Sequence, residues 1–265
     1  LAPPSAIMVG TGQVARRGIY IRNGEALETA ATLDTVVFDK TGTITEGRPT
    51  VTDFLPGAGH DEERTLALVA GVESHSEHYL ARAIGAYCAA RGATPAWTSD
   101  FESWPGRGVR AVVEGREVLV GNAALLDAAG IDCREAQDQA HAWAAQGKTP
   151  VFVAIEGGCA ALFAVADGAR PGAHEAITLL HRLGLRTVMA TGDLEAVAGH
   201  VAREVGIDEV IARASPADKL ALVRRLQGEG RRVGMIGDGI NDAPALAAAD
   251  VGFAIGGGAD IAVES

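Results

Sequence analysis

Four short polar clusters contain the residues of this sequence that are best suited to chemistry. Each cluster follows or borders an apolar run that reads as a buried strand. The clusters are Asp39-Lys40-Thr41-Gly42-Thr43, Thr191-Gly192-Asp193, Ser215-Pro216-Ala217-Asp218-Lys219 and Gly237-Asp238-Gly239-Ile240-Asn241-Asp242. Open α/β sheets place their functional residues at the carboxyl ends of the strands. We therefore expect the four clusters to meet at one edge of a sheet.

Three carboxylates, from Asp39, Asp238 and Asp242, would converge at this edge together with the ammonium group of Lys219. Two carboxylates about 4 Å apart repel each other by roughly 4 kcal/mol at an effective dielectric constant of 20. A divalent cation between them removes this repulsion. An all-oxygen site with few carboxylates suits Mg²⁺, which also binds phosphate oxygens. The cluster therefore predicts a magnesium-dependent phosphoryl site.

A carboxylate that faces a phosphoryl group beside Mg²⁺ is a nucleophile that forms an aspartyl-phosphate, and Asp39 is the candidate. The hydroxyl groups of Thr41 and Thr191, with backbone N–H groups, could hold the phosphoryl group while Lys219 neutralises its charge. Hydrolases built on this arrangement carry a second Asp two residues after the nucleophile, as general acid and base. Thr41 stands at that position. Because threonine cannot shuttle a proton at neutral pH, the aspartyl-phosphate is expected to be long-lived.

Strands and helices alternate around these clusters. The predicted strands are 35–39, 186–193, 209–214 and 232–239, and the predicted helices are 172–183, 194–205, 216–229 and 242–249. Such alternation indicates a doubly wound α/β domain, in which a parallel sheet has helices on both faces.

Residues from about 50 to 160 follow a different pattern. Helices are predicted near 62–71, 77–91 and 134–146, and strands of alternating polarity over 108–115, 116–122, 149–158 and 159–167. Gly115 and Gly157–Gly158 fit hairpin turns between these strands. We expect an inserted α+β domain built on an antiparallel sheet.

The composition limits the kinds of partner that the chain can bind and indicates the compartment in which it works. The net charge of −11 argues against nucleic acid as a partner. Cys88, Cys133 and Cys159 stand far apart without a CxxC pair, and we expect them to be buried small residues in a reducing compartment. There is no apolar run of about 18 residues and no signal peptide. The sequence does not begin with an initiator Met, and we expect it to be an excised fragment.

Four segments occur in the order found in P-type ATPases, namely DKTGTITEG (39–47), TGD (191–193), PADK (216–219) and GDGINDAPALAAADVGFAIG (237–256). Over nearly its whole length the chain resembles the cytoplasmic, ATP-hydrolysing part of these pumps. The resemblance implies a haloacid-dehalogenase-like phosphorylation domain at residues 1–49 and 161–265, and a nucleotide-binding domain at 50–160. The implied catalytic residues are Asp39, Lys219, Thr41, Thr191, Gly192 and Asp193. The implied ligands of Mg²⁺ are Asp39, Thr41 and Asp238, with Asn241 and Asp242 in support.

The segment VESHSEHYLARAI (72–84) resembles the SEHP signature of heavy-metal-transporting P-type ATPases, and PGRGV (105–109) resembles their downstream Gly-x-Gly. The resemblance implies that ATP is bound by Glu73, His78, Gly106 and Gly108. Tyr79 replaces the proline of the signature. With Ser76 as the expected N-cap of a helix over 77–91, position 79 falls in the first turn, where proline is dispensable. We therefore expect a working ATP site.

The segment PPSAIMVGTGQVARRGIYIRNGEALE (3–28) resembles the one that follows the metal-binding membrane helix of copper(I) exporters. The implied function is the ATP-binding and autophosphorylating part of a copper(I) export pump, on the cytoplasmic side of a plasma or inner membrane. Its partners would be the pump's own actuator and transmembrane domains, and the transported metal would bind outside this chain. The alternatives are a zinc or cadmium exporter, a soluble phosphatase of the same superfamily, and a silent nucleotide-binding module.

Overall fold

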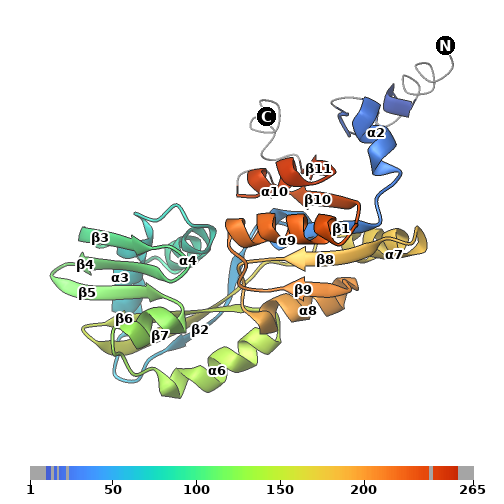
Figure 1. Cartoon of the computed structure of the whole chain (residues 1–265). Coiled ribbons are helices and arrows are strands. Elements are labelled where there is room, and N and C mark those ends of the chain that lie inside the picture. Colours follow the sequence, from blue (N-terminus) through green and yellow to red (C-terminus); the bar gives the residue numbers. More distant parts are fainter. Residues whose placement is uncertain (1–9, 13–14, 17, 22–23, 239–240, 256–265) are drawn as a thin grey trace, which may run out of the picture. The chain divides into compact units, whose positions relative to one another are not determined.

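The computed structural model describes residues 10–12, 15–16, 18–21, 24–238 and 241–255 (Figure 1). Parts of two sequence segments used above, 3–9 and 239–240, therefore lie outside the described residues, as does Gly256. The described chain divides into two compact units. The first contains the residues up to Ile44, Pro171–Thr191 and those from Val205 onward, and the second contains Thr45–Arg170 and Gly192–Glu204.

A five-stranded parallel sheet forms the centre of the first unit. Its strands are β1 (Thr35–Asp39), β8 (Arg186–Ala190), β9 (Glu209–Ile211), β10 (Val233–Gly237) and β11 (Val251–Ala254). They lie in the order β11-β10-β1-β8-β9. The chain first adds β8 and β9 on one side of β1 and then adds β10 and β11 on the other side. The direction of the connections therefore reverses between β1 and β10. Ligands of open α/β sheets bind at such a switch point.

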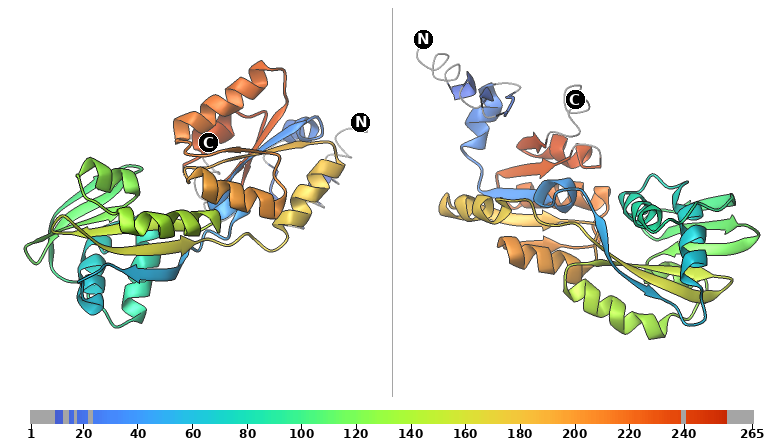
Figure 2. Two further views of the ribbon diagram at one scale, coloured as in Figure 1. Left: turned by 90° about the horizontal axis from the view of Figure 1, so that it is seen from below. Right: turned by 180° about the vertical axis from the view of Figure 1, so that it is seen from behind.

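Helices cover both faces of this sheet, as Figure 2 shows for α7 on one side and α9 on the other. The helices of the unit are α2 (Gly24–Ala30), α7 (Ala173–Arg182), α9 (Pro216–Gly228) and α10 (Ala243–Ala248). Leu222, Val223 and Leu226 of α9 pack on Val37 and Met235 in one apolar cluster. The predicted doubly wound α/β arrangement is confirmed. Strand β1 has the predicted bounds, whereas β8, β9 and β10 end two or three residues earlier than predicted, so the polar residues after these three strands follow the sheet edge.

The second unit is built on a six-stranded antiparallel sheet with the order β2-β7-β6-β5-β4-β3. Its strands are β2 (Thr50–Pro56), β3 (Thr98–Trp104), β4 (Gly108–Val113), β5 (Arg116–Gly121), β6 (Thr149–Ile155) and β7 (Gly158–Ala166). Two-residue turns at Glu114-Gly115 and Glu156-Gly157 have positive φ at both positions, which hairpins of this length require. The two predicted hairpins are therefore confirmed.

Side chains alternate between the two faces of this antiparallel sheet. Val118 and Val120 face a cluster formed with α3 (Glu62–Glu73) and α4 (Tyr79–Ala90). Leu119 faces the opposite cluster, formed with α5 (Ala123–Ala128) and α6 (Arg134–Ala145). The segment that contains α8 (Glu195–Val205) groups largely with this unit, and the imidazole Nδ1–H of His200 donates a hydrogen bond to the carbonyl of Ala145 at 3.2 Å.

Strand β7 continues past the predicted domain boundary at 160/161. Residues on both sides of that boundary pair with β2 and β6, from Gly158 to Ala166. Beyond the strand, the Asp167 carboxylate accepts hydrogen bonds from the Thr45 hydroxyl at 2.5 Å and from the backbone N–H of Gly47 and Arg48 at 3.2 and 3.1 Å. This carboxylate joins the two chain segments that border the first unit.

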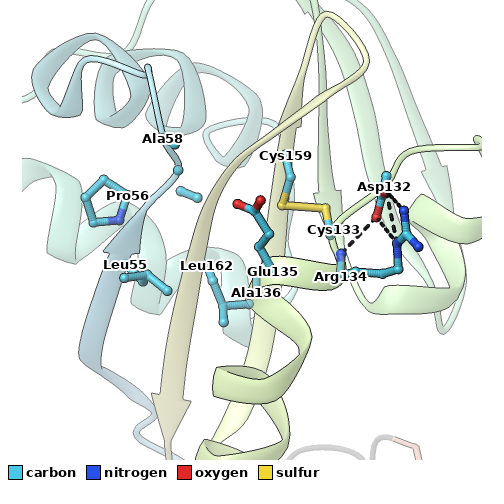
Figure 3. A pocket seen from close by; sticks show the side chains of 12 residues that line it. Leu55, Pro56, Ala58, Asp132, Cys133, Arg134, Glu135, Ala136, Cys159 and Leu162 are labelled. Carbon is cyan, nitrogen blue, oxygen red and sulfur yellow. Dashed lines mark hydrogen bonds and ion pairs between the residues drawn. A yellow bond between two sulfur atoms is a disulfide. The ribbon is translucent and has the colours of Figure 1, made fainter.

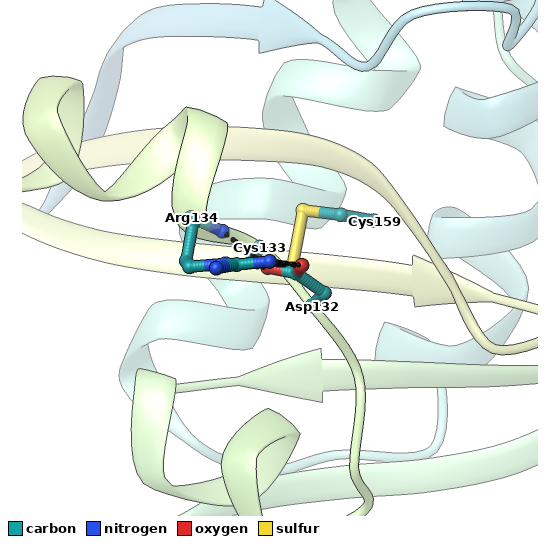
Figure 4. Close-up of a disulfide and its surroundings, with 4 residues drawn as sticks. All are labelled: Asp132, Cys133, Arg134 and Cys159. Atoms are coloured by element: carbon teal, nitrogen blue, oxygen red, sulfur yellow. Dashed lines mark hydrogen bonds and ion pairs between the residues drawn. A yellow bond between two sulfur atoms is a disulfide. The ribbon is translucent and has the colours of Figure 1, made fainter.

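Cys133 and Cys159 form a disulfide, with their Cα atoms 5.4 Å apart and a sequence separation of 26 (Figure 4). The expected burial is confirmed for Cys88 and Cys133, whereas Cys159 is half-buried. The expectation of separate cysteines is wrong for the bridged pair and right for Cys88, which is free. Sequence spacing did not reveal the pair because β7 passes the start of α6 only in the folded unit. No helix within the described ranges is long and apolar enough to cross a membrane.

Candidate active site and nucleotide site

Asp39 and Asp238 lie at the ends of neighbouring parallel strands. Asp39 is the last residue of β1 and Asp238 follows β10, and the register pairs Phe38 with Ile236. The two carboxylates therefore stand at the switch point of the sheet, as the sequence predicts. Asp39 is 6% exposed, and Asp238 is half-buried.

The first turn of α9 positions Lys219 beside Asp39. Ser215 caps this helix by accepting a hydrogen bond from the backbone N–H of Asp218, whose carboxylate in turn accepts from the Ser215 backbone N–H. Pro216 occupies the first helical position, where its fixed φ suits the helix. This capping fixes the first turn, so Lys219 points into the sheet edge with 7% exposure.

The Lys219 ammonium group donates to two carboxylates at once. Its Nζ lies 2.5 Å from Asp39 Oδ1 and 2.7 Å from Asp242 Oδ1. Burial raises the pKa of Asp39 to about 6, against the opposing charge of Lys219 and with a further rise from Asp242. Burial acts to lower the pKa of Lys219, but the two carboxylates outweigh it and the pKa is raised. The ammonium group therefore stays charged and holds the carboxylates together.

Asp242 carries a second oxygen, Oδ2, that is buried and has no hydrogen-bond partner within the described part of the chain. This carboxylate lies directly against Gly237, because a Cβ added there would meet Asp242 Oδ2 at 2.5 Å. Asp242 therefore requires glycine at the end of β10.

The donor chemistry of the site fits Mg²⁺. Asp39 and Asp238 supply carboxylate oxygens at one sheet edge, and Mg²⁺ in phosphoryl-transfer sites is held by one or two carboxylates together with substrate phosphates and water. Among the described residues, at this site and elsewhere, no group of three or more His, Cys, Asp and Glu side chains is arranged to hold a metal by itself.

The other predicted residues of the phosphoryl site are placed as follows. Thr41 lies, half-buried, in the tight turn Lys40–Ile44 after β1, in which Gly42 has a φ of 73°. Thr191 is buried one residue beyond β8, whose last residue pairs with Asp39. Asn241 is exposed. Gly192 and Asp193 group with the second unit, so their part at Asp39 stays a prediction.

The proposed adenine-contacting residues lie at the turn between α3 and α4. Glu73 is the last residue of α3 and is 7% exposed, and burial raises its pKa to about 7. His78 is the N-cap of α4, and its Nδ1 accepts a hydrogen bond from the Leu80 N–H at 3.3 Å. The tautomer with a proton on Nε2 follows from this bond.

The expected cap of this helix is wrong. Helix α4 starts at Tyr79 and not at residue 77, and Ser76 accepts a hydrogen bond from the His78 N–H at 3.4 Å instead of capping the helix. The reason is that Ser76 still belongs to the turn that ends α3, where its N–H donates to the Glu73 carbonyl. Tyr79 is therefore the first helical residue, where proline is most favoured.

Gly106 lies in the turn between β3 and β4, and Gly108 is the first residue of β4. Gly108 has a φ of 146°, and a Cβ there would overlap the Val120 carbonyl and the Gly121 backbone. The Asn122 side chain donates to the Gly106 carbonyl at 2.8 Å, and its N–H donates to the Arg107 carbonyl at 2.8 Å.

Two further residues, Gly121 and Asn122, hold this loop, and the sequence analysis did not predict their role. A Cβ on Gly121 would overlap the Arg107 carbonyl, and Asn122 is the N-cap of α5. A Gly-Asn pair directly after a strand was the available signal. The α3–α4 turn lies beside β3, the strand that leads into this loop, since His75 contacts Phe101 with ring centroids 5.9 Å apart.

Comparisons with known proteins identify the family to which the chain belongs. A family model described as haloacid dehalogenase-like hydrolase matches residues 33–250. Copper-transporting ATPase 2 of Rhizobium meliloti is 48% identical over 265 residues, and the copper-exporting P-type ATPase of Vibrio cholerae is 46% identical over 265 residues. Each match covers the whole chain but only 32% and 29% of the relative, so the chain spans about a third of the length of these relatives.

Two solved structures are also similar. The catalytic CPx-ATPase domain CopB-B is 32% identical with a TM-score of 0.73, and the match covers 96% of this chain and 90% of that domain. A zinc-transporting PIB-type ATPase in its E2.Pi state is 35% identical with a TM-score of 0.71, over 99% of this chain and 42% of that protein.

Proposed function

Because this chain belongs to the haloacid dehalogenase-like hydrolase family and matches nearly all of a CPx-ATPase catalytic domain, we propose that it is the ATP-binding, autophosphorylating part of a metal-exporting P-type ATPase. The observation that carries the proposal is the buried group of Asp39, Lys219 and Asp242 at the switch point of the parallel sheet. A buried carboxylate beside one fixed positive charge is suited to attack on an anionic phosphoryl group.

In this mechanism the Asp39 carboxylate attacks the γ-phosphorus of ATP. The bond between that phosphorus and the oxygen bridging to ADP breaks, ADP leaves with the electron pair, and an acyl phosphate forms on Asp39. Lys219 neutralises charge on the transferred group and keeps Asp39 oriented. Mg²⁺, when bound by Asp39, Thr41 and Asp238, would neutralise further phosphate charge.

Thr41 determines the fate of the acyl phosphate. Its hydroxyl group cannot serve as a general base at neutral pH, so water is not activated at the position where phosphatases of this fold carry an acid. The intermediate therefore persists until another domain directs water at it, as a pump requires. A phosphatase would gain nothing from such a delay.

ATP would be bound in the second unit by Glu73, His78, Gly106 and Gly108. The glycines let the backbone approach the nucleotide. The imidazole of His78 is exposed and lies against the Tyr79 ring, with centroids 4.4 Å apart, so a purine would stack on its other face. Asn122 supports the glycine turn. Asn241, Asp242 and Thr191 would complete the phosphoryl site in the first unit. Gly192 and Asp193, which follow Thr191 in sequence, are the further residues proposed for this site.

Copper(I) is the proposed cargo, and zinc or cadmium is the alternative. The curated relatives named above are copper-transporting, whereas one similar solved structure is zinc-transporting. The residues that bind the transported ion, the transmembrane helices and the actuator domain would all belong to the remaining length of such a pump. This chain would then work on the cytoplasmic side of a plasma or inner membrane.

The test is ATP-dependent labelling of the chain. With γ-labelled ATP and Mg²⁺ followed by an acid quench, we expect a phosphoprotein that hydroxylamine cleaves. Asp39→Asn should abolish the label while calorimetry still detects ATP binding. A phosphatase would instead hydrolyse simple phosphate esters without retaining label, and a silent module would bind ATP without label, so either result would exclude the proposed function.

A further inference from the structure

The two bridged cysteines line an open pocket of about 780 Å³ in the second unit (Figure 3). One wall is the segment Leu55–Ala58 at the end of β2, and another is β7 from Cys159 to Leu162. The remaining wall is the start of α6, where the Glu135 carboxylate points into the pocket. Arg134 contributes little free charge, because its guanidinium group is bonded to the Asp132 carboxylate.

The two cysteines differ in accessibility. Cys159 is half-buried, whereas Cys133 is 6% exposed and packs in the apolar cluster beneath α5 and α6. Cys133 is also the N-cap of α6, a helix of 12 residues, and its side chain makes no capping hydrogen bond. The partial positive charge at a helix N-terminus favours a thiolate at that position. One cysteine is therefore accessible to a reagent, and the other is placed as the internal nucleophile.

We propose that Cys133 and Cys159 are a reversible redox modification site, oxidised by exchange with a small-molecule disulfide that enters this pocket. The Cys159 thiolate attacks one sulfur of the small disulfide, whose S–S bond breaks and releases one thiol. The Cys133 thiolate then attacks Cys159 Sγ in the mixed disulfide, the protein disulfide forms, and the second small thiol leaves. Two protein thiols are oxidised and one small disulfide is reduced to two thiols.

Oxidation stabilises the second unit. The bond closes a segment with a sequence separation of 26 residues, which contains α6 and β6. Closing a loop of this length restricts the unfolded chain, which corresponds to a rise in melting temperature on the order of 10 °C. Trp97, Trp104 and Trp143 are the tryptophans of the sequence and all belong to this unit, so their fluorescence reports its melting.

The experiment equilibrates the whole chain in mixtures of reduced and oxidised glutathione, quenches with acid, and counts free thiols by a maleimide gel shift. We expect two thiols to disappear together and a third to remain. Cys88→Ser is the matched control, because Cys88 is fully buried in the apolar cluster on the opposite face of the sheet from the pair, and it should keep the transition and its two-electron slope. Oxidised and reduced samples should differ by about 10 °C in the melting followed by tryptophan fluorescence.

Two single variants test the order of reaction. In Cys133→Ser the mixed disulfide between Cys159 and glutathione should accumulate, detected as a mass increase of one glutathione. In Cys159→Ser the same adduct at Cys133 should form at least tenfold more slowly. Three free thiols in wild-type chain held in oxidised glutathione would overturn the proposal. Faster adduct formation in Cys159→Ser would overturn the assignment of Cys159 as the accessible partner.

Discussion

Replacing Lys219 with methionine removes one charge from the buried group at the sheet edge and keeps most of the side-chain volume. In the native chain a single ammonium group is hydrogen-bonded to both Asp39 and Asp242. After Lys219→Met, two carboxylates with 6% and 1% exposure lose their shared partner. The assay omits Mg²⁺, which could otherwise compensate the two carboxylates.

The size of the loss follows from the geometry. Since the two carboxylate oxygens lie 2.5 and 2.7 Å from the same nitrogen, they are at most about 5.2 Å apart. At an effective dielectric constant of 20, two negative charges at this distance repel by about 3 kcal/mol, and proton uptake by Asp39, whose pKa is about 6 even beside Lys219, limits this repulsion at pH 7. Removing one partner of a buried ion pair costs about 3–5 kcal/mol. We therefore expect Lys219→Met to lower the free energy of unfolding by about 3–5 kcal/mol.

Urea unfolding at pH 7 in the absence of ATP and Mg²⁺ measures this loss, with circular dichroism as the probe. Tryptophan fluorescence, which reports only the second unit, distinguishes loss of the first unit from general unfolding. The double variant Lys219→Met with Asp242→Asn removes the repulsion and should recover about 1–3 kcal/mol. A loss below about 1 kcal/mol in the single variant, or no recovery in the double variant, would refute the electrostatic reasoning.

Three further outcomes are expected. Burial raises the pKa of Glu73 from 4.5 to about 7, so the folded chain holds a proton that the unfolded chain releases, and stability falls as pH rises through this window. Glu73→Gln should therefore stabilise the chain by up to about 3 kcal/mol at pH 8 and leave it unchanged at pH 4 in urea titrations, and equal effects at both pH values would contradict the assignment. Tyr79→Pro, at the first residue of α4, should change ATP affinity by less than about fivefold in calorimetry, whereas His78→Ala should weaken it several-fold; a tenfold gain with proline would mean that Tyr79 impairs the site. Gly237→Ala should displace the Asp242 carboxylate and cost about 1–3 kcal/mol in unfolding free energy, and an unchanged value would show that the site relaxes freely.

Much of the first unit could be predicted because its local signals agree with its topology. Apolar runs that end in an Asp or Gly cluster, each followed by a helical pattern, have few arrangements other than a parallel sheet. Ser215 and Pro216 mark the start of α9 in sequence, and this start places Lys219 in the first helical turn. The strand β11 was missed because it has only four residues, of which Val251 alone is buried.

The second unit was harder to predict at its edges. Strands β2 and β3 are the outer strands of the sheet and carry polar or exposed side chains, so their alternation is weak. The start of α4 was placed too early because a Ser was favoured over His78 as the cap, although an imidazole nitrogen can accept the same hydrogen bond. The bond between Cys133 and Cys159 depends on tertiary structure alone.

The identity of the phosphorylated residue is the most direct test of the proposed function. After a brief incubation with ATP and Mg²⁺ and an acid quench, borohydride reduces an aspartyl-phosphate to homoserine, which mass spectrometry locates in a peptide. We predict homoserine at position 39 in the wild-type chain and none in Lys219→Met, in which Asp39 loses its ionic partner. Phosphate found on Thr41, Thr43 or another hydroxyl group, or homoserine at any other position, would contradict Asp39 as the nucleophile.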